Sequence, residues 1–140
     1  PPTVEPEAVP APHELALAVV GAHLSGLPLN NELTRRGGRL LRATTTSPIY
    51  RFYKLDGDPP ARPGLVRAES GGAPIAVEVW AIPKVEIGEV LQAIPQPLGL
   101  GTIDLADGSR VHGFLAEAAG VRGALDITRH GGWRAYLETL

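Results

Sequence analysis

The sequence predicts an α+β domain in which a small mixed or antiparallel sheet, open or closed into a barrel, carries two to three helices. Three observations predict this fold class. A continuous apolar run at 15–20 ends at a glycine, several later segments are rich in β-branched or aromatic residues, and segment 102–115 has the pattern of a hairpin. Strands interleaved with a few helices in this way pack as layers around one core.

Length and composition are those of one globular domain. The chain has 140 residues, of which 44% are hydrophobic and 20% charged. Residues 1–13 are rich in proline and predict an extended linker, so the domain is expected to be 14–140. The sequence contains no methionine, not even at its start, and we therefore expect it to be a piece of a longer protein.

Charge and cysteine content disfavour several classes of function. A formal net charge of −2 gives no field that would attract nucleic acid or an anionic membrane. No apolar run approaches the roughly 18–20 residues that cross a bilayer, and the first residues do not resemble a signal peptide. The absence of cysteine fits a reducing compartment. We expect a cytoplasmic protein without a nucleic-acid or membrane partner.

The predicted elements follow one another closely along the chain. The run 15–20 is apolar on both faces, which is typical of a strand in the centre of a sheet. A helix of two to three turns is expected from Pro28 to Arg36, because proline suits a first helical turn and Gly37 can end the helix in a left-handed conformation. The other expected elements are strands at 39–46, 49–55, 65–68 and 75–82, a helix at 83–93 and a closing helix at 132–140.

The hairpin at 102–115 has a register that the sequence itself indicates. A three-residue loop, 106–108, with Gly108 left-handed places Ile103 opposite Val111. It also places Asp104 opposite Arg110 as a pair of opposite charges. A two-residue loop would break the alternation of apolar and polar residues, so the longer loop is favoured.

The best candidate for chemistry is the segment 21–26, which follows the first predicted strand. A strand that runs into glycine and a turn exposes successive backbone N–H groups, and these can hold the oxygens of an anion. His23 lies on this turn, where an imidazole that titrates near neutrality can transfer a proton. Alternatively, Gly21 and Gly26 only permit tight geometry, and His23 caps a backbone group.

Other polar residues are weaker candidates. Tyr50 lies on an aromatic strand, where it either packs in the core or binds a carboxylate through its hydroxyl. Glu78 interrupts an apolar strand, so we expect a solvent-facing residue rather than a buried acid beside a pocket. No phosphate-binding loop, dinucleotide fingerprint or nucleophile elbow is present. The four histidines lie far apart in the sequence, so no metal or other cofactor is expected.

Several segments in order resemble the C-terminal domain of allophanate hydrolase. These are 21–30 (GAHLSGLPLN), 42–44 with 50–51, 78–83 (EVWAIP), 94–102 (IPQPLGLGT), 126–128 and 131–137 (GGWRAYL). The resemblance covers about residues 15 to 140 and implies a γ-glutamyl cyclotransferase-like fold, a small mixed β-barrel or sheet. In the cyclotransferases a loop after the first strand binds the substrate carboxylate through its amides. Their catalytic glutamate is absent here, because the matching position falls at Pro95 and Gln96.

The resemblance further implies a role in urea and cyanuric-acid nitrogen catabolism, on the N-carboxycarbamate that the amidase step produces. In our enzymatic hypothesis, His23 is the catalytic acid/base, and the substrate is held by Gly21, Ala22, Leu24, Ser25, Asn30 and Tyr50. The expected partners are a small carboxylate substrate, the N-terminal amidase domain of the parent enzyme and a second copy of the chain in a homodimer. The Ser–Ser–Lys amidase signature is not found in this sequence. A non-catalytic assembly module and a cyclotransferase-like enzyme are the alternatives.

Overall fold

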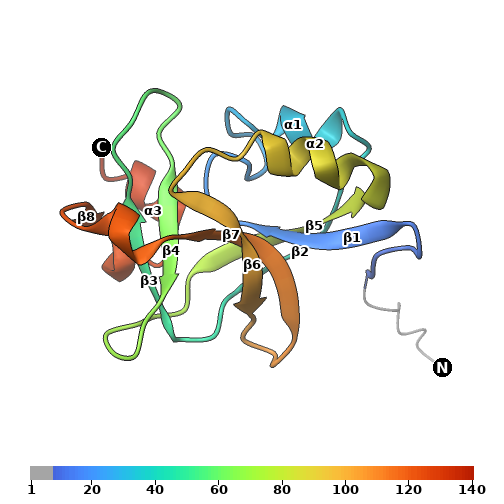
Figure 1. Ribbon diagram of the computed structural model, residues 1–140. Coiled ribbons are helices and arrows are strands. Elements are labelled where there is room, and N and C mark those ends of the chain that lie inside the picture. The colour runs from blue at the N-terminus through green and yellow to red at the C-terminus, as the bar shows by residue number, and fades with distance from the viewer. Residues whose placement is uncertain (1–7) are drawn as a thin grey trace.

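The computed structural model describes residues 8–140 and builds them around a five-stranded sheet. Its strand order is β2-β5-β1-β7-β6, so the first strand, β1, is central, as the apolar run predicted (Figure 1). β1 pairs parallel to β7, and the other neighbours are antiparallel. The strands of this sheet are β1 (Glu14–Val19), β2 (Arg39–Thr45), β5 (Ala76–Pro83), β6 (Leu98–Asp104) and β7 (Arg110–Ala116).

A second, three-stranded sheet has the order β4-β3-β8 and adjoins the first where β4 packs against β7. Its strands are antiparallel and comprise β3 (Tyr50–Lys54), β4 (Pro63–Arg67) and β8 (Leu125–Asp126). The α+β class is therefore confirmed, and the two sheets remain open. The helices are α1 (Asn31–Thr34), α2 (Ile87–Gln92) and α3 (Trp133–Leu137).

The helices lie at two places around the sheets. α1 and α2 lie side by side over one end of the large sheet, and α3 lies beside the small sheet (Figure 1). Single 3-10 turns precede or separate the other elements, at Lys84–Glu86, Ala118–Val121 and Thr128–His130. No helix among residues 8–140 has the length and apolar character needed to cross a membrane.

The core fills the space between the two sheets and the helices. β1 and β5 supply its centre, because seven of the eight residues of β5 have at most partial exposure and most of β1 is buried. The fully buried side chains include Leu17, Val19, Tyr50, Phe52, Leu65, Ile75, Ile82 and Ile103. Burial on both faces of a strand is what a continuous apolar run requires.

The predicted helices at both ends of the domain are longer than the observed ones. Segment 28–36 contains only the single α-helical turn of α1, because the chain from Leu24 onward folds through successive turns instead. One of them is closed by the Leu29 N–H, which donates to the Ala22 carbonyl over 2.9 Å. Gly37 is left-handed, with φ +85°, as expected. α3 has five residues where nine were expected at 132–140.

The hairpin between β6 and β7 confirms the predicted register. Ile103 pairs with Val111 and Asp104 with Arg110, and the Arg110 Nε lies 3.0 Å from Asp104 Oδ1. Gly108 has φ +87°, the left-handed conformation that the three-residue loop needs. The local sequence pattern alone was sufficient to predict this register.

Candidate active site

The turn that follows β1 depends on a glycine at its first position. A Cβ atom on Gly21 would lie 2.3 Å from Cδ of Pro63, the first residue of β4. Real Cβ atoms do not approach other carbons this closely, so only glycine lets the end of β1 contact the start of β4. This contact brings the turn from one sheet against a strand of the other.

His23 projects from this turn into a confined position. Its side chain is 13% exposed and stacks on the Phe114 ring of β7, with the ring centroids 5.2 Å apart and the planes 12° from parallel. Its Nε2 lies 3.0 Å from the Glu32 carboxylate on α1. Two contacts from two different elements therefore fix the plane and the direction of the imidazole.

The contact with Glu32 also determines the tautomer of His23. An ionised carboxylate only accepts hydrogen bonds, so Nε2 carries the proton that Glu32 accepts. In the neutral imidazole, Nδ1 then has the free lone pair. Burial lowers the pKa of His23 below its ordinary value of 6.5 and outweighs Glu32, which raises it, while the nearby Arg62 guanidinium lowers it further. At pH 7 the unliganded imidazole is neutral.

Backbone donors accompany the imidazole on the turn. The Leu24 N–H donates to the Gly21 carbonyl over 2.9 Å, which closes the turn. The N–H groups of Ala22 and His23 have no hydrogen-bond acceptor among residues 8–140. Two free adjacent amides on a turn are receptive to an anion.

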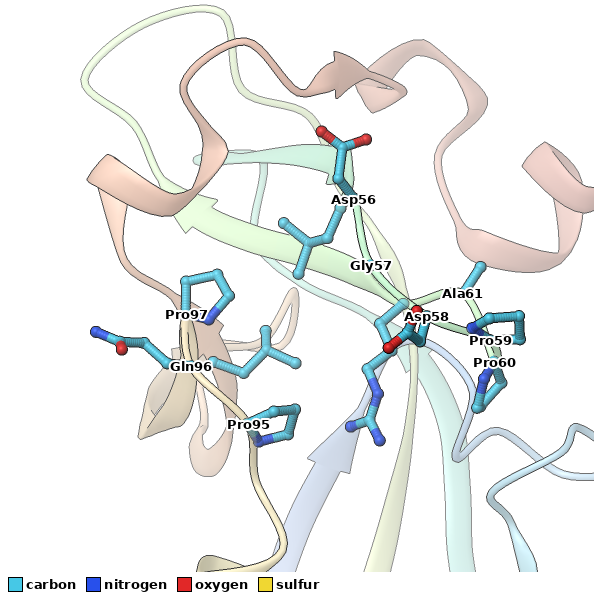
Figure 2. Close-up of a pocket in the computed structure, with 12 residues that line it drawn as sticks. Asp56, Gly57, Asp58, Pro59, Pro60, Ala61, Pro95, Gln96 and Pro97 are labelled. Atoms are coloured by element: carbon cyan, nitrogen blue, oxygen red, sulfur yellow. The ribbon is translucent and has the colours of Figure 1, made fainter.

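A small recess opens beside these groups and leads to a larger groove. The His23 recess, about 20 Å³, is lined by Val20, Gly21, Ala22, His23, Arg62, Pro63, Leu98 and Phe114. The outer groove, about 330 Å³, shares Arg62 and Leu98 with it. Figure 2 shows the two walls of this groove, the loop of Asp56 to Ala61 on one side and Pro95 to Pro97 on the other. The recess has room for about one water-sized group, such as a single ligand oxygen, and the groove has room for the rest of a small molecule.

The other side of the same turn is held by a buried carboxylate. Glu78 is 9% exposed, so the expectation that it faces solvent is wrong. Its Oε1 accepts from the Ser25 N–H at 2.8 Å, the Ser25 hydroxyl at 2.9 Å and Trp80 Nε1 at 3.1 Å. Its Oε2 accepts from Arg134 at 3.2 Å. Burial acts to raise the pKa of Glu78, but these donors together lower it.

The residues expected at the site therefore divide into two groups. Gly21, Ala22 and His23 line the recess together. The other four are engaged elsewhere. Leu24 is buried with its N–H inside the turn, Ser25 binds Glu78, the Asn30 amide donates to the His23 carbonyl, and the Tyr50 hydroxyl accepts from the Asp104 N–H in the core. Asn30 thus supports the turn, whereas Tyr50 is not brought to His23.

Sequence reasoning missed the two charged residues that border His23. Glu32 is nine positions from His23 and reaches it only because the intervening turns reverse the chain. Arg62 comes from the loop before β4. No spacing rule indicates either residue. Among residues 8–140, no cluster of His, Cys, Asp or Glu could hold a metal ion.

These features define a class of protein: an α+β domain of two adjoining open sheets, with a histidine and free backbone amides in a pocket after its first strand. The sequence profile of the allophanate hydrolase C-terminal domain matches residues 15–138. The chain therefore belongs to the allophanate hydrolase C-terminal domain family.

Relatives of known sequence or structure agree with this assignment. Urea amidolyase of Saccharomyces cerevisiae is 41% identical over 130 residues, which cover 90% of this chain and 7% of the yeast protein. Allophanate hydrolase of Kluyveromyces lactis superposes with a TM-score of 0.86 at 38% identity, over 90% of this chain and 21% of that one. A uropathogenic E. coli-specific protein superposes with a TM-score of 0.83 at 35% identity. The superposition covers 91% of this chain and 98% of that one.

Proposed function

We propose that this domain decarboxylates N-carboxycarbamate, the carboxylated product of allophanate hydrolysis, in urea and cyanuric-acid nitrogen catabolism. The observation that carries the proposal is that His23, held by Glu32, shares one recess with the free amides at Ala22 and His23. Family membership supports the choice of substrate. The parent enzyme would supply this substrate from its N-terminal amidase domain.

The reaction needs one proton and no covalent intermediate. The dianion ⁻O₂C–NH–CO₂⁻ and one proton yield carbon dioxide and carbamate, H₂N–CO₂⁻. One C–N bond breaks, its electron pair stays on nitrogen, and the proton joins that nitrogen. A site for this step requires donors that hold a carboxylate and a group that delivers a proton.

His23 is suited to deliver that proton. The unliganded imidazole is neutral at pH 7, because burial keeps its pKa low. A bound dianion brings negative charge next to the ring and raises its pKa, so that substrate binding is coupled to proton uptake at Nδ1. Glu32 holds Nε2 and stabilises the imidazolium form that results. The protonated ring then donates from Nδ1 to the departing nitrogen.

The test is the variant His23→Asn, which keeps the size and polarity of the side chain approximately but cannot transfer a proton. N-carboxycarbamate would be generated in situ from allophanate by a separate amidase, and its loss followed by ¹³C NMR. We expect at least a ~100-fold lower rate, the usual contribution of a general acid. His112→Ala, at an exposed position of β7, is the control and should keep full activity. Equal turnover by His23→Asn and the parent chain would exclude the proposal.

An assembly role for the same domain is the second candidate. Val85, just before α2, is 91% exposed, and Leu91, on α2, is 53% exposed. Such exposed apolar side chains are available to a second copy of the chain. A homodimer that Val85→Glu converts to a monomer in sedimentation, with unchanged decarboxylation, would assign assembly to this surface. A cyclotransferase activity is not supported, because Gln96, which lines the outer groove where the glutamate would stand, is neutral and cannot act as a general base.

A further inference from the structure

Arg62 occupies the junction of all the cavities around His23. It lines the His23 recess, the outer groove and a third, smaller cavity of about 10 Å³ that reaches Glu32. The residue is only partly exposed, and it directly precedes Pro63, whose ring contacts Gly21. Any molecule that extends from the recess into the groove therefore passes this side chain.

Arg62 differs from most other arginines of the domain in lacking an acidic partner. Arg36, Arg39, Arg42, Arg67, Arg110 and Arg134 each lie within 4.0 Å of a carboxylate oxygen. Among residues 8–140, the guanidinium of Arg62 forms neither an ion pair nor a hydrogen bond, whereas its backbone carbonyl accepts from the Leu55 N–H. Arg62 as a whole is only partly exposed, and an unpaired guanidinium beside a recess is a strong donor to carboxylates.

Two separate sets of donors therefore meet at one small space. The amides of Ala22 and His23 form one set, and the five N–H donors of the Arg62 guanidinium form the other. From this arrangement we propose that Arg62 is a specificity-determining residue, which binds the second carboxylate of the ligand and makes the site select compact dianions over monoanions. This inference rests on the proposed function and names the residue that recognises its substrate class.

The outer groove limits how long the dianion can be. Asp56 and Asp58 are exposed on the wall of the groove opposite Pro95 and Pro97 (Figure 2). A ligand whose second carboxylate extends past Arg62 meets these like charges, which oppose its binding. The site should accordingly prefer malonate, which matches N-carboxycarbamate in shape and charge, to the longer glutarate.

Binding of three simple acids tests the inference without any turnover. Titration calorimetry would compare malonate, acetate and glutarate on the parent chain, on Arg62→Gln and on Arg62→Lys. We expect the parent to bind malonate ~10- to 100-fold more tightly than acetate, as charge-assisted hydrogen bonds predict. Arg62→Gln should lose that preference while acetate binding changes less than about twofold. Arg62→Lys should keep part of it, since the charge remains.

Two control variants make the outcome decisive. Arg122→Gln removes an exposed arginine that lines none of the cavities around His23 and should leave the affinities unchanged. Asp58→Asn should raise glutarate affinity and leave malonate affinity unaltered. If Arg62→Gln, folded by circular dichroism, still prefers malonate as the parent does, the inference is wrong even though His23 is still required for decarboxylation. If the parent binds malonate but does not decarboxylate N-carboxycarbamate, the proposed function fails and the role of Arg62 in binding stands.

Discussion

The two sides of the turn after β1 differ in whether their polar groups have hydrogen-bond partners. On one side, the carboxylate of Glu78 is saturated by donors from Ser25, Trp80 and Arg134. On the other side, the amides of Ala22 and His23 have no acceptor among residues 8–140. Buried polar groups in folded proteins are nearly always paired. The saturated side therefore holds the turn in place, and the unsaturated side leaves two donors available for the proposed ligand.

The largest expected effect is on the saturated side. Glu78→Ala leaves the Ser25 amide, its hydroxyl and the Trp80 indole without their acceptor, and should lower the free energy of unfolding by about 3 kcal/mol. Urea denaturation at pH 7 measures this loss. Glu138→Ala, an exposed glutamate that borders the same cavity as Glu78, is the control and should change stability by less than about 0.5 kcal/mol.

The same pair of variants gives a pH test. Because the folded protein holds the pKa of Glu78 below 4.5, the carboxylate stabilises the fold above pH 4.5 and loses this effect as the pH falls through its folded pKa. The stability difference between the parent and Glu78→Ala should therefore narrow in acid. A difference that is equal at pH 7 and pH 3 would contradict the role of the ionised carboxylate.

A smaller loss of stability is expected at the glycine that both sides share. Gly21→Ala forces a methyl group against the Pro63 ring, and overpacking of this kind should lower the free energy of unfolding by about 2 kcal/mol. It should also weaken malonate binding, since the turn that presents the amides must move. Gly88→Ala, which has no neighbour within 4 Å of its new Cβ, should be neutral or slightly stabilising. Similar losses in both variants would show that the Pro63 contact is unimportant.

The smallest change in stability is expected on the unsaturated side. Glu32→Gln removes a partly exposed pair with His23 and should cost less than about 1 kcal/mol. Because Glu32 raises the pKa of His23, its loss should lower that pKa further. The limb of the decarboxylation profile at which activity falls with rising pH should move to lower pH. Equal pH profiles for the parent and Glu32→Gln would show that Glu32 does not influence the proton transfer by His23.

Elements defined by local pattern were predictable from the sequence, and those defined by distant contacts were not. The apolar run of β1 predicts a central strand, and the pattern around Gly108 predicts a three-residue loop. The chain before α1 is folded back by the bond from the Leu29 N–H to the Ala22 carbonyl, and no helix propensity indicates that bond. The alternation within β5 suggested an exposed face, but the strand lies between β2 and β1 and is covered on both faces.

The candidate site was predictable in the same partial way. Glycine and histidine directly after a strand identified the turn and its imidazole. The partners Glu32 and Arg62 depend on chain reversal and on the approach of the second sheet, so a linear sequence gives no signal for them. Ser25 and Tyr50 were reasonable ligand-binding candidates by residue type. In the fold their polar atoms are used by Glu78 and Asp104.

The central position of β1 determines when the pocket can form during synthesis of the domain. Of the strands of this domain, β1 is synthesised first, but its neighbours are β5 and β7, whose paired residues lie up to 95 positions later in the chain. Arg134, which bonds both Glu78 and the Ser25 carbonyl, is synthesised after all eight strands. Long-range pairing of this kind slows folding. His23 is therefore synthesised early in the domain, but the strands that build its pocket are complete only after nearly all of the domain has been synthesised.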